Sequence, residues 1–201
     1  MKYIECCNIT KKFGHNLVID RFNYLFNNQN INFITGSNGC GNSTLISCIL
    51  EFLRFDGIIT SNVKKIAYQP EKVILPDYIK TKDYLLLISR IHKQDCEKRI
   101  DELIRLFGLE AIINKDLIKL SKGMRQKVLL IQTLMIDAGA YIFDEPLNGL
   151  DPLSQKKFME ELNKLYQTQK MIIIVTHFID QYTLEPKKIV NLNQKELYQN
   201  A

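Results

Sequence analysis

The sequence lacks any long apolar run, so nothing in it has the length of a membrane-spanning helix. Its most apolar stretches, MIIIV at 171–175 and YLLLI at 84–88, are far shorter than the roughly 20 residues that cross a bilayer. The N-terminus also has no continuous apolar segment and no small-residue cleavage site of a secretory signal. We therefore expect a cytoplasmic protein.

Paired cysteines and repeated segments are missing as well. The five cysteines show no C-x-x-C spacing, so neither a zinc motif nor a disulfide framework is indicated, and we expect reduced, mostly buried thiols. No internal repeat, low-complexity tract or Pro/Gly-rich linker divides the chain. With 201 residues, 46% of them hydrophobic, the sequence predicts one compact domain. The cysteines are Cys6, Cys7, Cys40, Cys48 and Cys96.

A strong excess of basic residues is absent too. The formal net charge is +5, and most of the excess lies between Tyr78 and Asp137, where 12 Lys and Arg stand against 8 Asp and Glu. So small a surplus does not indicate nucleic-acid binding. It suits a solvated helical surface, or a face turned toward acidic lipid headgroups or an acidic partner.

Short β-branched runs before Pro70 and after Ala140 have the composition of β-strands. Between them, apolar residues recur at i, i+3, i+4 and i+7 from Ile100 to Phe107, which marks one face of a helix. We expect an α/β core interrupted by a helical part. The strand-like runs are residues 3–9, 16–22, 30–35, 57–60, 65–68, 141–143, 171–176 and 187–192, and further helical patterns cover about residues 80–92 and 122–136.

The segment GSNGCGNST, residues 36–44, lies between a predicted strand and the helical pattern STLISCILEFL. Strand, glycine-rich turn and helix in this order are the context of a phosphate-binding loop. Its glycines let backbone N–H groups point at phosphate oxygens, and Ser43 would place its hydroxyl on Mg²⁺. In the helix, Leu45, Ile49 and Phe52 are expected on the buried side. A glycine-rich segment taken alone can also be an ordinary turn.

An acidic pair ends the apolar strand AYIFDEP at 140–146. Successive strand residues face opposite sides, so Asp144 and Glu145 suit two tasks, one near a metal ion and one toward an attacking water. Taken alone, they are equally compatible with polar residues at the end of a buried strand.

Three further sequence features have no clear meaning when each is taken alone, but together they indicate a family. LSKGMRQ at 120–126 begins a helix with Ser121 as its N-cap, and Gln69 and His177 each follow a predicted strand. In type, order and spacing, the phosphate loop, Gln69, LSKGM, IFDEP, LNGLD and His177 resemble the ATP-binding-cassette (ABC) ATPase family over nearly the whole chain.

The resemblance implies the fold and the extent of its parts. We expect a P-loop NTPase core, with a RecA-like mixed sheet and an antiparallel β subdomain, in residues 1–77 and 138–201. A helical subdomain carrying the family signature would occupy residues 78–137. The segment FDEPLNGLDP is similar to that of cassettes driving small bacterial exporters, and the chain resembles a stand-alone ATP-binding subunit.

The resemblance also implies roles for the site residues. Glu145 would be the general base for the hydrolytic water, and Asp144 the metal-side aspartate. Gln69 would contact Mg²⁺ and link the site to a membrane subunit, while His177 would lie near the γ-phosphate. Phe13 sits where the family stacks an aromatic ring on adenine. ATP would be bound by the Walker A loop, Gly36, Ser37, Asn38, Gly39, Cys40, Gly41, Asn42, Ser43 and Thr44, and Mg²⁺ by Ser43, Gln69 and Asp144.

The signature LSKGM implies a dimer. In the family this motif closes on the γ-phosphate bound to a second subunit, so Ser121 and Gly123 would contact the partner's nucleotide, and Asp151 in LNGLD would lie across the same interface. Here Lys122 replaces a glycine and Met124 a glutamine. We expect Lys122 to cost backbone freedom and to add positive charge near the triphosphate.

Asn42 stands where the family carries the lysine that binds the β- and γ-phosphates. Asparagine is shorter and neutral, so weak ATP binding and impaired hydrolysis are expected. Three explanations stay open: a natural non-hydrolysing site, a recent or introduced substitution, and rescue by another cation. The presence of Gln69, Asp144, Glu145 and His177 favours the second.

The leading hypothesis is the energy-coupling subunit of an ABC transporter, which binds MgATP as a homodimer or heterodimer and drives a membrane permease carried on a separate chain. It would lie at the inner face of the membrane through that permease. One alternative is a soluble ABC-type ATPase not coupled to transport, and another is a scaffold that dimerises on ATP without turnover. The substrate and the direction of transport stay open.

Overall fold

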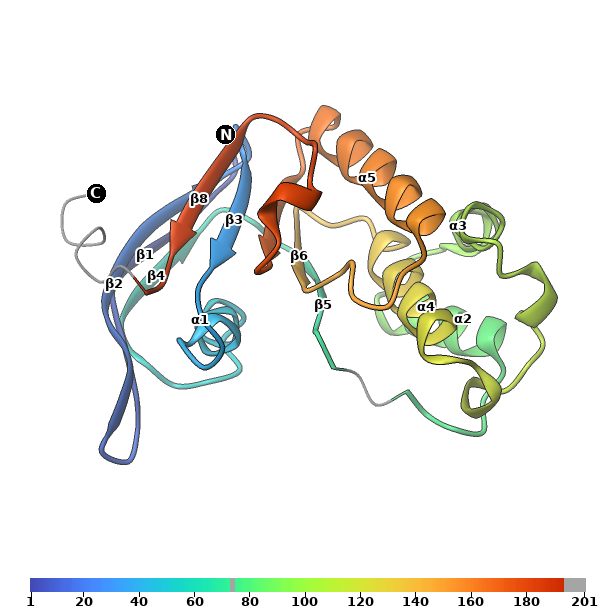
Figure 1. The fold of residues 1–201 in the computed structure, drawn as a ribbon, viewed down its shortest axis with the longest axis horizontal. Helices are drawn as coiled ribbons and strands as arrows, with labels where there is room; N and C mark the ends of the chain where they lie inside the picture. Colours follow the sequence, from blue (N-terminus) through green and yellow to red (C-terminus); the bar gives the residue numbers. More distant parts are fainter. Residues whose placement is uncertain (73–74, 194–201) are drawn as a thin grey trace.

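The computed structural model describes residues 1–72 and 75–193 (Figure 1). Two sheets form its framework. The antiparallel sheet has the order β2-β1-β4 and consists of β1 (Tyr3–Phe13), β2 (Asn16–Asn27) and β4 (Asp56–Ser61). The parallel sheet has the order β5-β6-β7-β3-β8 and consists of β3 (Ile31–Thr35), β5 (Ile66–Gln69), β6 (Ala140–Asp144), β7 (Met171–Val175) and β8 (Lys187–Asn191).

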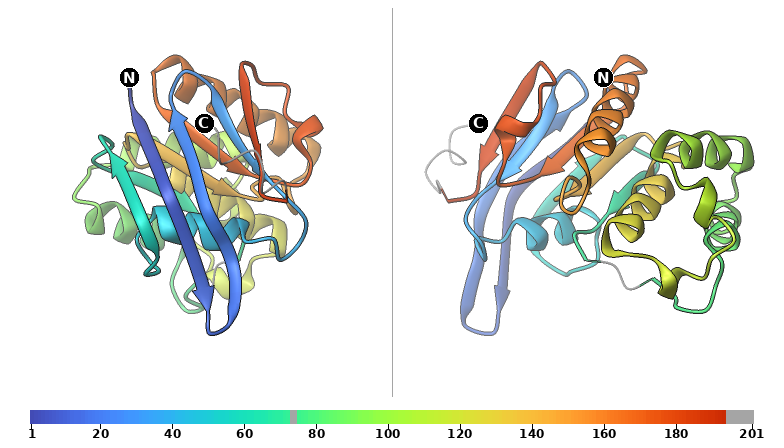
Figure 2. Two further views of the ribbon diagram at one scale, coloured as in Figure 1. Left: turned by 90° about the vertical axis from the view of Figure 1, so that its left-hand side faces the viewer. Right: turned by 45° about the vertical axis from the view of Figure 1, so that its right-hand side comes forward.

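The helices lie on both sides of the parallel sheet (Figures 1 and 2). One side carries the antiparallel sheet and α1, whereas α2 to α5 lie on the other. The expected fold class, a mixed α/β core with an antiparallel sheet and added helices, is confirmed. The helices are α1 (Asn42–Ile49), α2 (Thr81–Ile91), α3 (Glu97–Phe107), α4 (Lys122–Leu134) and α5 (Pro152–Gln167).

The alternation of side chains along each strand builds two cores, one on each face of the parallel sheet. On β6, Tyr141 and Phe143 join the core under α2 to α5, whereas Ala140 and Ile142 join the core that contains α1 and the antiparallel sheet. Asp144 continues the second series. The strand pattern therefore turns this carboxylate toward α1 and the loop that precedes it.

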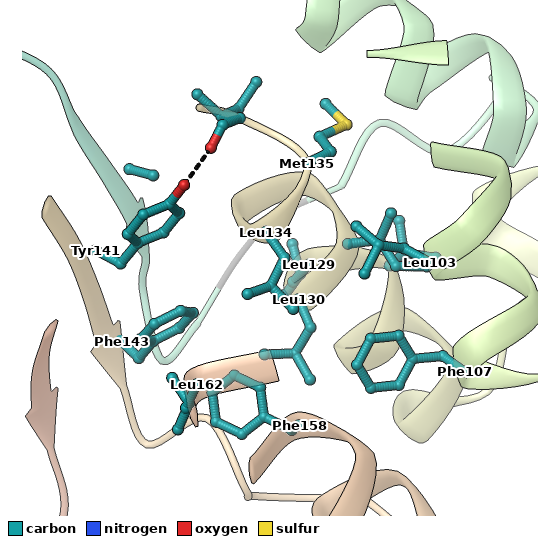
Figure 3. Packing of buried hydrophobic residues seen from close by; sticks show 14 of the residues in the cluster. Leu103, Phe107, Leu129, Leu130, Leu134, Met135, Tyr141, Phe143, Phe158 and Leu162 are labelled. Carbon is teal, nitrogen blue, oxygen red and sulfur yellow. Dashed lines mark hydrogen bonds between the residues drawn. The ribbon is translucent and has the colours of Figure 1, made fainter. Parts of the chain in front are cut away.

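The larger core joins the helices to the sheet (Figure 3). Phe143 of β6 meets the ring of Phe158 on α5 edge-on, with 5.1 Å between their centroids. Leu103 on α3 and Leu130 on α4 are fully buried in the same cluster. Residues 78–137, the predicted helical subdomain, contain α2, α3 and α4, and these helices share their apolar interior with the core.

Three local features differ from the sequence prediction. The burial expected for Phe52 is wrong: α1 ends at Ile49, Glu51 takes a left-handed φ of 59°, and Phe52 is 69% exposed. The strands predicted at 3–9 and 16–22 extend into a long hairpin through Phe13 and Asn27. Helix α5 is an addition that the apolar patterns did not reveal. Within the described ranges, no helix combines the length and apolarity that a membrane crossing requires.

Candidate functional site

The loop of residues 36–44 connects β3 to α1 and lines a cavity of about 420 Å³. Gly39 and Gly41 have φ angles of 81° and 111°, which side chains rarely tolerate, and a Cβ on Gly41 would come within 2.9 Å of a Val18 methyl group. A Cβ on Gly36 would overlap the Cys40 sulfur. The backbone therefore takes a path that only glycine permits, and this path leaves N–H groups available to an anion.

The cavity brings together residues that are far apart in the chain. The loop supplies one wall, the ends of β6 and β7 supply a second, and Glu71 after β5 supplies a third. The lining residues are Ser37, Asn38, Gly39, Gly41, Asn42, Ser43, Thr44, Glu71, Asp144, Glu145, Asn148, Val175, His177 and Phe178.

Asp144 is buried at this edge, where its Oδ2 accepts a hydrogen bond of 3.2 Å from the Ser43 hydroxyl. Burial raises the pKa of Asp144 to about 6, and the nearby carboxylates of Glu71 and Glu145 act in the same direction against the Ser43 hydrogen bond. Burial makes the charged form of Asp144 unfavourable, and a cation bound next to the carboxylate would stabilise that form.

Gln69 does not line the cavity, but it ends the strand next to β6 and carries a buried amide that no described residue satisfies. It is the last residue of β5, paired in register with Phe143, and its side chain is 1% exposed. Both polar atoms of its amide lack a hydrogen-bond partner within the described residues. Buried polar groups are nearly always satisfied, so this amide indicates a ligand or water. Hydroxyl, carboxylate and amide oxygens are hard donors of the kind that Mg²⁺ binds, and the residues fit that ion.

Glu145 is fixed more tightly than its neighbour. Its φ of 47° is unusual for a residue with a side chain, and such strain concentrates at functional sites. The carboxylate accepts hydrogen bonds from the Thr176 hydroxyl at 3.1 Å and from the His177 backbone N–H at 3.0 Å. The His177 ring places Nε2 3.6 Å from Glu145 Oε1. The acid and the histidine therefore form one unit at the rim of the cavity.

Asn42 is the first residue of α1 and only 9% exposed. Its Oδ1 accepts a hydrogen bond of 3.3 Å from the Cys40 thiol, whose pKa is raised by burial. The cavity lining contains three acids, Glu71, Asp144 and Glu145, and no lysine or arginine among the residues that the structure describes. The phosphate loop therefore lacks a positive side chain of its own.

Ser121, Gly123 and Asp151 do not line this cavity. Ser121 caps α4, because its hydroxyl accepts the Met124 N–H at 3.3 Å. Asp151 caps α5 and also pairs with Lys127 of α4 at 2.8 Å, and these contacts hold the pKa of Asp151 well below its ordinary range. Ser121, Gly123 and Asp151 therefore lie where the start of α4 packs against the loop after β6.

Close packing fixes α4 against that loop. A Cβ on Gly123 would lie 2.9 Å from the Gly149 carbonyl oxygen, so no larger residue fits without a shift. Gln126 Nε2 donates to the Pro146 carbonyl at 3.4 Å. The start of α4 is therefore packed closely against the chain segment that follows Glu145.

Phe13 lies outside the cavity, at the end of β1, where its ring is 49% exposed and the Lys11 ammonium is 4.9 Å from the centroid. Four lining residues were not predicted from the sequence: Glu71, Asn148, Val175 and Phe178. Their positions shortly after Gln69, in the LNGLD segment, at the end of the strand before His177 and directly after His177 are the signals that could have indicated them.

Comparison with known proteins gives one consistent result. Residues 19–148 match the sequence family described as ABC transporter. An ABC transporter ATP-binding protein of Mycoplasma pneumoniae is 30% identical over 88% of this chain and 59% of its own length. The zinc import ATP-binding protein of Rickettsia conorii is 30% identical over 94% of this chain and 82% of its own. This chain thus spans about three fifths of the first relative's length.

Solved structures agree with the sequence comparison. The ATP-binding subunit of an ABC transporter superimposes with a TM-score of 0.85 at 25% identity, covering 94% of this chain and 86% of the other. A dimeric bacterial ABC transporter cassette gives a TM-score of 0.79 at 22% identity, covering 94% of each chain. The second comparison, at this identity, supports the fold alone.

Proposed function

The chain belongs to the ABC transporter family, whose members hydrolyse ATP, and on this premise we propose that it is the ATP-binding, energy-coupling subunit of such a transporter. The observation that carries the proposal is the single cavity in which the glycine-built loop, Asp144 and the Glu145–His177 unit face one another. Fold likeness alone would not suffice, because function resides in the site.

The proposed ligand is MgATP. Backbone N–H groups of the loop and of the N-terminus of α1 would hold the phosphates, except those of Ser37 and Cys40, which donate to Asn193 and to the Ser37 carbonyl. Ser43, Asp144 and Gln69 would hold Mg²⁺, which when bound supplies charge stabilisation at the phosphoryl oxygens. The exposed ring of Phe13 would stack on the base from the hairpin of β1 and β2.

Glu145 would act as general base. Its carboxylate is held by Thr176 and by the backbone of His177, so it is oriented toward the cavity before any substrate arrives. The His177 ring beside it also lines the cavity and would contact the γ-phosphate. Glu145 would accept the proton of the attacking water, and His177 would help to position the γ-phosphate.

The proposed assembly is a head-to-tail pair of such subunits on a membrane permease. Ser121, Gly123 and Asp151 do not line the cavity of their own chain, which supports a role at the cavity of a second chain. The permease would place the subunit at the inner face of the membrane. Zinc import is the activity named for the Rickettsia relative.

A binding and turnover assay tests the proposal. Calorimetry with MgATP is expected to detect weak binding to the native chain, and Asn42→Lys is expected to raise the ATPase rate at least tenfold, since the lysine stabilises charge on the transferring phosphoryl group. Asp144→Asn in the Asn42→Lys background should abolish turnover. No heat with adenine nucleotides, even with lysine at position 42, would end the proposal. Co-purification with a polytopic membrane protein rather than with ribosomes or DNA distinguishes the transporter from a soluble ATPase.

A further inference from the structure

A buried phenol lies behind the Glu145–His177 unit. Tyr182 follows the 3₁₀ turn Ile179–Gln181, and its backbone N–H donates to the Ile179 carbonyl at 3.0 Å. This turn returns the chain to the larger core, where the Tyr182 side chain is 1% exposed. Its ring meets Phe33 of β3 edge-on, with 5.2 Å between the ring centroids. The fold therefore buries a tyrosine shortly after His177.

The hydroxyl of Tyr182 is not explained by packing. Among the described residues it has no hydrogen bond of good geometry, and phenylalanine would fill the same space without burying a polar atom. Burial raises the pKa of Tyr182 well above its ordinary range, the Glu145 carboxylate acts in the same direction, and a contact with the Thr176 side chain opposes both. The hydroxyl therefore lies beside Thr176 and within the field of Glu145.

The Thr176 hydroxyl has room for one more donor. It donates its proton to Glu145 Oε2 at 3.1 Å, and its oxygen accepts the Phe178 N–H at 3.1 Å. A hydroxyl has one proton and two lone pairs, so one lone pair remains. A phenol that donates to this lone pair gains the partner that it lacks. Hydrogen bonds in a chain polarise one another, so the donation would also strengthen the bond from Thr176 to Glu145.

We propose that Tyr182 is a positioning residue for the general base: its hydroxyl donates to Thr176 Oγ1 and, through Thr176, holds the Glu145 carboxylate toward the attacking water. The carboxylate is then held from two sides, at Oε2 by Thr176 and at Oε1 by the backbone of His177. Tyr182 is not among the described residues that line the cavity, so it acts only through Thr176. This inference rests on the proposed function, in which Glu145 accepts the proton of water.

Tyr182→Phe tests the inference, because it removes the hydroxyl and keeps the ring. It is measured in the Asn42→Lys background, where turnover is expected to be highest. The kcat for ATP hydrolysis is expected to fall about three- to tenfold, as for one lost hydrogen bond, while KM stays within about twofold of its starting value. A residue that orients the base, and does not bind the nucleotide, changes kcat alone. A kcat that stays within about twofold would overturn the inference.

A double-mutant cycle with Thr176→Val tests whether Tyr182 acts through Thr176. Valine keeps the shape of threonine and removes the hydroxyl that joins Tyr182 to Glu145. In the Thr176→Val background, Tyr182→Phe is expected to change kcat by less than about twofold, because the link is already broken. Equal losses in both backgrounds would mean that Tyr182 acts by another route, and the inference would be wrong.

Tyr141→Phe is the matched control. Tyr141 is also buried, but it lies near the start of β6, where its hydroxyl donates to the Ile136 carbonyl at 2.6 Å and accepts the Ala138 N–H at 3.2 Å. Loss of these two bonds is expected to lower the midpoint of urea denaturation and to leave kcat unchanged. If Tyr141→Phe lowers kcat as much as Tyr182→Phe, the effect comes from stability and the inference is overturned.

A spectroscopic measurement tests the contact without nucleotide. In protein labelled with ¹³C at tyrosine Cζ, the Tyr182 signal is the one that Tyr182→Phe removes. This signal is expected to shift in Thr176→Val, because the phenol loses its acceptor, whereas the Tyr141 signal should stay in place. Tyr182→Phe should also not raise the midpoint of urea denaturation, as removal of a hydroxyl without a partner would. A Tyr182 signal that Thr176→Val leaves unchanged would overturn the inference.

The outcomes separate the inference from the function. If Asn42→Lys hydrolyses ATP but Tyr182→Phe changes neither kcat nor the response to Thr176→Val, the inference is overturned and the proposed function stands. If the Tyr182 signal responds to Thr176→Val but no variant binds or hydrolyses ATP, the hydrogen bond exists, and the proposed function is overturned together with the role of Tyr182 in it.

Discussion

Among single residues, Asp144 shows how burial changes the pKa of a carboxyl group and, through it, the pH dependence of stability. Its place in the alternation of β6 turns it toward Ser43, and the cost of burying its charge raises its pKa to about 6. The folded pKa lies above the unfolded value, so the protonated form contributes stability at low pH. That contribution is complete below about pH 4 and is lost as the pH rises through 6.

We therefore expect the metal-free protein to lose unfolding free energy relative to Asp144→Asn between about pH 4 and pH 7, on the order of 2–3 kcal/mol. Chemical denaturation of both proteins across this range measures the difference. Mg²⁺ should stabilise the native chain above about pH 6 and leave the Asp144→Asn variant unchanged. Parallel pH curves for the two proteins would contradict the assignment of Asp144.

Cys40 is a second single residue that can report whether nucleotide occupies the phosphate loop. Its thiol is partly buried in the phosphate loop, against Asn42 and next to Gly36. Mg-ATP is expected to slow modification of Cys40 by a thiol reagent, as followed by mass spectrometry, because the phosphates would cover the loop. Cys7, half-buried on β1 and away from the loop, serves as the internal control. Equal slowing at both cysteines would indicate a global effect and not binding at the loop.

The sequence predicted many of the residues that line the cavity, but not their environment. The glycines of residues 36–44 predicted the loop only together with the strand before it, the helix after it and the other motifs, since glycines alone are compatible with an ordinary turn. The burial of Gln69, the strain at Glu145 and the presence of Glu71 depend on how β5, β6 and β7 lie together, and no local pattern contains that information.

At the level of elements, helix caps fix the geometry around α4 and α5. Asp151 begins α5 by accepting the Ser154 N–H at 2.9 Å, and Pro152 follows at the first helical position. The same carboxylate binds Lys127, which joins α5 to α4. One residue therefore couples the two helices.

Asp151→Ala is expected to lower the free energy of unfolding by about 1–2 kcal/mol, since the cap and the ion pair are lost together. Asp151→Ser keeps a capping oxygen and removes the ion pair, and should recover most of the loss because exposed pairs contribute little. Urea denaturation of the three proteins measures both steps. Equal destabilisation by Ala and Ser would assign the effect to the ion pair.

Element boundaries show where pattern reading fails. The eight strand-like runs all contain strands in the structure, since β-branched residues suit buried sheets. Helix α5 was missed although Asp151 and Pro152 form a helix-start signal, because that segment was interpreted only as a motif. Phe52 was placed in α1 on periodicity, whereas the left-handed Glu51 ends the helix before it.

At the scale of the whole molecule, the larger core makes the helices and the sheet one folding unit. Leu103 of α3, Phe143 of β6 and Phe158 of α5 belong to a single buried cluster (Figure 3). Arg99 of α3 also pairs with Glu161 of α5, whose carboxylate is nearly fully buried. Unfolding of α3 alone would expose this cluster.

Leu103→Ala is expected to lower the free energy of unfolding by about 2–5 kcal/mol within one cooperative transition, because the cavity it leaves lies in the shared core. Far-ultraviolet circular dichroism and tyrosine fluorescence should report the same midpoint. Leu87→Ala, at an exposed position of α2, is the matched control and should change little. Two separate transitions in the variant would mean that the helices fold independently.

The cation-poor cavity has a consequence for the ionic conditions under which it can be filled. Three acids line it, and the described lining contains no lysine or arginine, so a bound anion would depend on backbone dipoles and on a metal ion for its positive surroundings. Occupancy should therefore fall steeply when divalent ions are chelated.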